Sequence, residues 1–130
     1  MDETRYLKSR AKTARGRLRQ IENWCRDHHE TTYPVKSVTW AAGMKDFGDT
    51  TFFPEGKYLR IRCDKNLLTI SIPLSIHIIM HEWAHAMSWD NSSTEYHCDE
   101  WAKAYARLYR HFFDELGYEE SKEYDPAPWK

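Results

Sequence analysis

Apolar side chains recur along the first part of the chain at alternating spacings of four and three residues. They are Leu7, Ala11, Ala14, Leu18, Ile21 and Cys25. This spacing places them on one stripe of an α-helix, so we expect a helix over residues 4–26. Gly16, near the middle of that segment, weakens it by about 1 kcal/mol relative to alanine.

The same segment is strongly basic. Residues 5–19 contain no acidic side chain and these basic ones: Arg5, Lys8, Arg10, Lys12, Arg15, Arg17 and Arg19. Most fall off the apolar stripe, which predicts the solvated face of a helix that docks on the core. The alternative is a face that contacts the phosphates of nucleic acid, with an affinity that falls as salt rises. We expect His28 and His29 to mark the frayed end of this helix. We do not expect them to form a second metal site, because adjacent side chains on a helix diverge.

Alternation of polar and apolar residues predicts strands in the next part of the chain. Residues 36–42 alternate and end at Gly43, which indicates a first strand. Residues 44–56 are rich in glycine and proline, which favours turns, with residues 51–53 as a candidate short strand.

The strictest alternation lies at residues 58–63, which predicts a half-buried strand. It places Leu59, Ile61 and Cys63 on one face. The following residues, 67–72, fit either the returning strand of a hairpin or a direct lead into the next helix.

Two helices are expected in the second half of the chain. The first runs over residues 73–89, because Pro73 suits a first helical turn and residues 90–93 are a stop signal. Its buried face is predicted to contain Ile76, Ile79, Met80, Trp83 and Met87. The second begins with a capping box at residues 92–95 and ends before Gly117. Its inward stripe is His97, Trp101, Tyr105, Leu108 and Phe112.

These elements predict an α+β fold in which a small antiparallel or mixed sheet packs against an N-terminal helix and two further helices. A chain of 130 residues has the length of one domain. We divide it into a basic helix at residues 1–30, a core at residues 36–116 and an acidic tail at residues 117–130. The net charge of −1 argues against a purely electrostatic nucleic-acid binder.

The cysteines and the apolar runs bear on the environment of the protein. Three cysteines without a C-x-x-C pair make a disulfide framework improbable. No apolar segment follows Met1, and no apolar run reaches the roughly 18–20 residues that span a bilayer. We therefore expect a soluble cytoplasmic protein that does not insert into membranes.

Candidate chemistry lies in the helix at residues 73–89. His81, Glu82 and His85 form an H-E-x-x-H motif. Residues i and i+4 share one face of a helix, so both imidazoles can bind one Zn2+ ion. Glu82 then stands beside the ion, where it can accept a proton from a metal-bound water.

A third ligand is expected from the following helix. His97 opens the inward stripe of that helix, so it can face the two motif histidines. Competitors for this position are Glu95, Asp99 and Glu100. His77 lies one turn before His81, but three ligands along one straight helix cannot surround an ion tetrahedrally. We therefore interpret His77 as a neighbour of the site or a surface residue.

The order of these elements and motifs resembles the SprT-like zinc metallopeptidases and the related minigluzincin-type domains. The similarity covers residues 36–113 and depends on the H-E-x-x-H motif followed by His97 and Trp101 on the next helix. One departure is Cys98, which stands where the family usually has glycine. No cysteine-rich zinc ribbon follows the motif in this sequence.

The resemblance implies a zincin-like core with zinc ligands at His81, His85 and His97, and Glu82 as general base and acid. It also implies that an edge strand, at residues 38–42, receives an extended peptide by strand addition. Tyr96 and Tyr105 are candidate donors to the oxyanion that forms during hydrolysis.

Two functions follow from these residues. The first is a zinc-dependent metallopeptidase that acts on a peptide or protein substrate. The second is a zinc-stabilised binding module without turnover, which engages nucleic acid through basic residues 5–19 or binds a partner protein.

Overall fold

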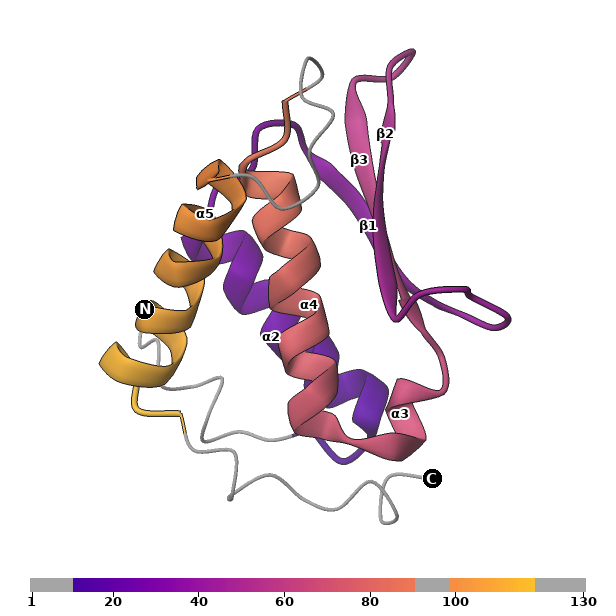
Figure 1. Ribbon diagram of the computed structural model, residues 1–130. Coiled ribbons are helices and arrows are strands. Elements are labelled where there is room, and N and C mark those ends of the chain that lie inside the picture. Colours follow the sequence, from indigo (N-terminus) through magenta and orange to yellow (C-terminus); the bar gives the residue numbers. More distant parts are fainter. Residues whose placement is uncertain (1–10, 91–98, 119–130) are drawn as a thin grey trace.

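The computed structural model describes residues 11–90 and 99–118 (Figure 1). Its sheet has three strands in the order β1-β3-β2: β1 is Val35–Ala41, β2 is Gly48–Phe53 and β3 is Tyr58–Asp64. β1 pairs with β3 in parallel, whereas β2 pairs with β3 in antiparallel orientation. The expected α+β class is confirmed, and the sheet is mixed.

The helices lie on one side of the sheet (Figure 1). They are α2 at Ala14–His28, α3 at Leu67–Ile70, α4 at Ile72–Met87, α5 at Asp99–Tyr109, and the π-helix η1 at Arg110–Glu115. α4 contacts β2, β3, α2 and α5. The helix that carries the H-E-x-x-H motif is therefore the central element of the fold.

The half-buried strand predicted at residues 58–63 is confirmed as β3. Leu59, Ile61 and Cys63 are fully buried, and the side chains between them are partly exposed. Its hairpin partner is β2, which precedes it in the chain and is longer than the strand expected at residues 51–53. Residues 67–70 form the short helix α3 and not a returning strand, so β3 leads through α3 into α4.

The helix expected over residues 4–26 is not continuous in the described part of the chain, because residues 11–13 are not helical. Helix α2 starts at Ala14, because the Thr13 side chain caps it by accepting a hydrogen bond from the Gly16 backbone N–H. Ala11 lies before the helix, and its backbone N–H donates to Gln20 Oε1. A Cβ at Gly16 would lie 2.9 Å from both Ala11 Cβ and Thr13 Oγ1, so glycine permits this close approach.

The basic face of α2 is only partly the solvated face that we expected. Lys12, Arg15 and Arg19 are exposed, but Arg17 is fully buried beside the apolar stripe. Its guanidinium donates to Gln20 Oε1. The remaining basic residues of this segment, Arg5, Lys8 and Arg10, lie outside the described residues.

Helix α4 follows its sequence signals closely. Ser71 caps it by accepting a hydrogen bond from the Leu74 backbone N–H, and Pro73 occupies the first turn. The expected apolar face packs into the core, with these residues buried: Ile76, Ile79, Met80 and Trp83. The helix ends at Met87, two residues before the expected end.

The C-terminal part of the described chain is more ordered than the sequence suggests. Leu108 and Phe112 are buried as expected, and Gly117 has the positive φ of a glycine stop. Tyr118 is also buried, with its ring 4.5 Å from that of Phe112, so the expected loose tail does not begin there. Residues 119–130 and the capping box at residues 92–95 lie outside the described residues.

Two expectations concern features of the chain as a whole. Cys25 and Cys63 are buried free thiols, and Cys98 lies outside the described residues. Among the helices that the structure describes, none is both long enough and apolar enough to span a membrane.

Candidate metal centre

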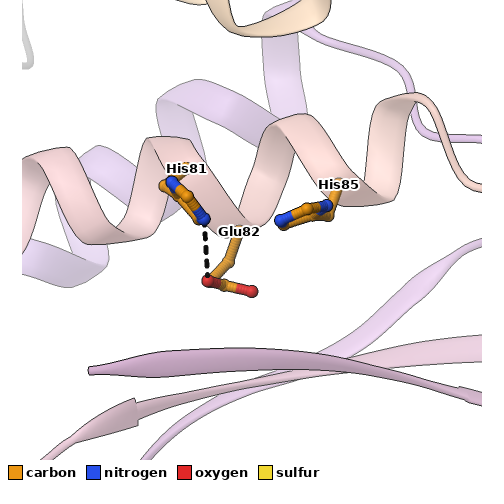
Figure 2. Close-up of side chains that lie close together, drawn as sticks. All are labelled: His81, Glu82 and His85. Atoms are coloured by element: carbon orange, nitrogen blue, oxygen red, sulfur yellow. Dashed lines mark ion pairs between the residues drawn. The ribbon is translucent and has the colours of Figure 1, made fainter. Parts of the chain in front are cut away.

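The motif side chains gather on the side of α4 that faces the sheet. Glu82 points toward the strands, and the rings of His81 and His85 flank it (Figure 2). The two imidazole centroids are 5.0 Å apart. One nitrogen from each histidine and one Glu82 oxygen all lie within 4.8 Å of one another. No other group of three His, Cys, Asp or Glu side chains in residues 11–90 and 99–118 has this spacing.

Glu82 is the buried member of the group, with 5% of its surface exposed. The Thr50 hydroxyl of β2 donates to its Oε1 at 2.8 Å. Its other carboxylate oxygen, Oε2, lies 3.7 Å from His81 Nε2. One oxygen therefore faces the sheet and the other faces the histidines.

Burial changes the acidity of Glu82. Its removal from water raises the pKa of Glu82 to about 7, because the charged form loses solvation. The hydrogen bond from Thr50 opposes this rise, and the negative charges of Asp49 and Asp46 add to it. A cation bound between the histidines would favour the ionised carboxylate.

Helix α5 closes the opposite side of the two histidines with an aromatic ring. The Trp101 ring centroid is 5.0 Å from that of His81 and 5.5 Å from that of His85. Its indole N–H donates to the His81 carbonyl oxygen at 3.2 Å. This contact fixes α5 against the turn of α4 that carries the motif.

A pocket of about 630 Å³ opens beside the motif, in the size range of ligand sites. Besides the motif side chains it is lined by Asp46, Phe47, Gly48, Asp49, Thr50, Ile78 and Trp89. Asp49 is held by Arg62, which donates from Nε to Oδ1 at 3.1 Å and from Nη2 to Oδ2 at 2.5 Å. The pocket therefore combines apolar walls with carboxylates next to two potential metal ligands.

The strand edge beside the histidines is that of β2. Gly48 and Thr50 line the pocket, whereas no residue of β1 does. Both strands are edges of the described sheet, but β3 and β2 separate β1 from the motif. The strand that we expected to receive a peptide, residues 38–42, is thus at the far edge.

The third ligand remains a prediction. His97 lies outside the described residues, as do its competitor Glu95, the candidate oxyanion donor Tyr96, and Cys98. Asp99 and Glu100 are exposed in the first turn of α5 and do not belong to the group around His81 and His85.

His77 and Tyr105 interact with each other. The His77 Nδ1 atom and the Tyr105 hydroxyl are 3.3 Å apart, and the His77 ring stacks on Phe113. The Tyr105 ring is 6.4 Å from that of His81. His77 therefore contacts residues of α5 and η1 and does not belong to the group around His81 and His85. A role for Tyr105 as oxyanion donor stays a prediction.

His28 and His29 do not form a frayed end. His29 is buried, and its Nε2 lies 2.9 Å from Nδ1 of His111 in η1. The His28 ring also contacts His111, and Trp24 packs against all three imidazoles. The contacts among these three histidines and Trp24 join the end of α2 to η1. His29 can turn toward η1 because it is the C-cap of α2 and its backbone is extended. Among the described residues these histidines do not form a group with the spacing of a metal site.

The sequence patterns missed two residues of the site, Gly48 and Thr50. Both lie in a segment that glycine and proline mark as turns. Their spacing of two places them on one face of a strand, and the pairing with β3 makes that face the inward one. If the strand predicted at residues 51–53 were extended back to Gly48, the alternation would place Gly48 and Thr50 together on one of its faces.

Comparison of the chain with family models, with curated proteins and with solved structures gives no match.

Proposed function

We propose that this protein is a zinc-dependent hydrolase, and specifically a metallopeptidase. The observation that carries the proposal is the grouping of two imidazoles and one buried carboxylate beside a pocket of about 630 Å³. Two neutral histidines at i and i+4 on one helix suit Zn2+ as a ligand pair. Among the hydrolytic reactions open to such a site, the resemblance to the SprT-like metallopeptidases favours peptide hydrolysis.

His81 and His85 would hold the ion, together with His97 as the expected third ligand. The donor set fits zinc, because imidazole nitrogen is among its preferred ligands and both rings approach from one side of α4. A zinc ion in that position acts as a Lewis acid and lowers the pKa of a bound water.

Glu82 would carry the proton during hydrolysis. Its Oε2 faces His81, so it can accept a proton from the attacking water and return it to the leaving amine. Burial assists this role, because it brings the basicity of the carboxylate closer to that needed at neutral pH.

A peptide would bind in extended form along the free edge of β2. β2 has one strand neighbour in the described sheet, and Gly48 and Thr50 place that strand at the pocket. Strand addition supplies affinity through backbone hydrogen bonds, and neighbouring pockets select side chains.

The substitution Glu82→Gln tests the catalytic claim. We expect it to keep zinc and fold but to lower peptide hydrolysis by 100-fold or more, because the amide cannot accept the proton. The measurement is cleavage of unfolded casein by the zinc-loaded protein, with metal content from elemental analysis. Glu55→Gln, in the exposed turn after β2, is the matched control. Equal activity of the Glu82→Gln and wild-type proteins would exclude Glu82 as the proton carrier.

The ligand set is tested by His81→Ala, His85→Ala and His97→Ala, with His77→Ala as control. Each of the first three is expected to lower zinc affinity at least 100-fold, because each removes a ligand, whereas the control retains it. The readout is competition with a fluorescent zinc chelator. An unchanged affinity in the His97 variant would remove His97 from the ligand set.

A binding module is the second candidate function, and the exposed Lys12, Arg15 and Arg19 favour it. These residues would contact phosphates, so DNA affinity should fall steeply with salt. Replacement of all three by glutamine should flatten that dependence, as measured by fluorescence anisotropy with a labelled oligonucleotide. Affinity that does not change with salt would contradict this function. Glu82→Gln should leave it intact.

A further inference from the structure

We propose that Gly48 and Thr50 of β2 form a socket for the Glu82 side chain, in which Thr50 is a positioning residue that holds one carboxylate oxygen at the strand and prevents the carboxylate from binding the ion through both oxygens. This inference rests on the proposed metal site. According to this inference, a strand outside the H-E-x-x-H motif controls the position of the motif glutamate.

The hydrogen bond from Thr50 is the first observation. The Thr50 hydroxyl has a single proton, and its two nearby acceptors both belong to Glu82. The carboxylate Oε1 is at 2.8 Å and the carbonyl oxygen at 3.2 Å, so the carboxylate is the nearer acceptor. The Glu82 side chain is only 6% exposed. Hydrogen bonds to a charged group in such surroundings are stronger than those at the surface.

The space at Gly48 is the second observation. A Cβ at this position would lie 3.0 Å from Glu82 Cγ and 3.2 Å from Oε2. It would also lie 3.1 Å from Cγ2 of Ile78, one turn earlier on α4. A side chain at position 48 would therefore require Glu82 or Ile78 to shift by a few tenths of an ångström. Glycine suits this close approach of β2 to α4.

The register of the sheet directs both Gly48 and Thr50 toward the Glu82 side chain. Gly48 pairs with Cys63 and Thr50 pairs with Ile61, and both partners are buried. Gly48 and Thr50 consequently face α4 rather than solvent. Gly48 leaves space for the Glu82 side chain, and Thr50 donates a hydrogen bond to it.

The socket decides between two roles of Glu82. One Glu82 oxygen lies within 4.8 Å of a nitrogen of each histidine, so the carboxylate is close enough to become a ligand itself. Thr50 engages Oε1 and leaves Oε2 directed at His81. A carboxylate tethered in this way cannot ligate through both oxygens, and its free oxygen remains available to a proton.

The experiment compares Thr50→Val, which removes the donor at nearly constant volume, with Thr50→Ser, which retains it. We expect Thr50→Val to lower kcat about 10- to 100-fold with KM within twofold, as is typical for loss of such supporting contacts. Thr50→Ser should stay within about threefold of wild type. Thr39→Val is the matched control, because Thr39 lies on the exposed face of β1.

A second readout does not depend on turnover. In the Co2+-substituted protein, entry of the Glu82 carboxylate into the coordination sphere raises the coordination number and weakens the visible absorption bands. We expect this change in Thr50→Val and in Gly48→Ala, but not in Thr50→Ser. Thermal unfolding followed by circular dichroism identifies a variant that does not fold, and Gly48→Ala then replaces Thr50→Val in the comparison.

The outcomes separate this inference from the proposed function. If Thr50→Val and Gly48→Ala match wild type in the cobalt spectrum and in kcat, the socket is overturned. If the wild-type protein cleaves no peptide but the cobalt spectra differ as expected, the peptidase proposal fails and the socket stands. If Thr50→Ser loses activity as far as Thr50→Val does, the hydroxyl is not the positioning group and the inference is also overturned.

Discussion

At the scale of single residues, burial changes what each titratable side chain can do. Glu82 lies between α4 and β2, where loss of solvation raises its pKa to about 7. The same effect acts on two thiols. Burial raises the pKa of Cys63 to about 12, with further contributions from the charges of Glu82 and Asp49, and it raises the pKa of Cys25 as well. The carboxylate becomes a better base, whereas the thiols become inert.

The thiols give a prediction that needs no substrate. Cys25 and Cys63 should not react with a thiol reagent between pH 7 and pH 9, because a raised pKa leaves almost no thiolate and both sulfurs are fully buried. A Cys98→Ser background isolates them. Titration with Ellman's reagent at pH 8 should find no reactive thiol in the folded protein and two after unfolding in guanidinium. Rapid labelling of either thiol in the folded protein would contradict this burial.

At the scale of elements, local signals place α4 and tertiary pairing places β2. Ser71 accepts a hydrogen bond from the Leu74 backbone N–H, and Pro73 fits the first turn, so the start of α4 is encoded nearby. β2 has no comparable signal. Its side chains are all partly exposed and its start at Gly48 depends on pairing with Cys63 of β3.

The cap of α4 can be tested by Ser71→Ala, which removes the side-chain acceptor at the N-terminus of the helix. We expect the free energy of unfolding to fall by about 1 kcal/mol. Ser71→Asp retains an acceptor and should stay within about 0.5 kcal/mol of wild type. Urea unfolding followed by circular dichroism measures both. Equal losses in the two variants would show that the cap does not stabilise this helix.

At the scale of the whole molecule, α4 connects the candidate metal centre to the rest of the fold. It contacts the sheet on one side and packs against α2 and α5. The Trp83 indole N–H donates to the His29 carbonyl oxygen at the end of α2, and the Trp101 indole N–H donates to the His81 carbonyl oxygen. An ion held by α4 would therefore stabilise the packed state of several elements.

Zinc should raise the thermal stability of the protein under the proposed function. At free zinc 100 times its Kd, the stabilisation is about 2.7 kcal/mol, because the ion binds the folded state in preference to the unfolded chain. Differential scanning calorimetry should show a higher Tm with zinc and its reversal by EDTA. His81→Ala/His85→Ala should show no such rise. An equal rise in this double variant would place the binding elsewhere.

Local sequence signals are sufficient for the features that depend on neighbours along the chain. The i, i+4 spacing of His81 and His85, the inward face of β3 and the start of α4 all follow from local periodicity and capping. The surroundings of Glu82, in contrast, depend on tertiary packing. Thr50 is 32 positions away from it, and His29 and His111 are separated by 82. Such contacts depend on how elements pack, and the periodicity of a single element carries no information about its partners.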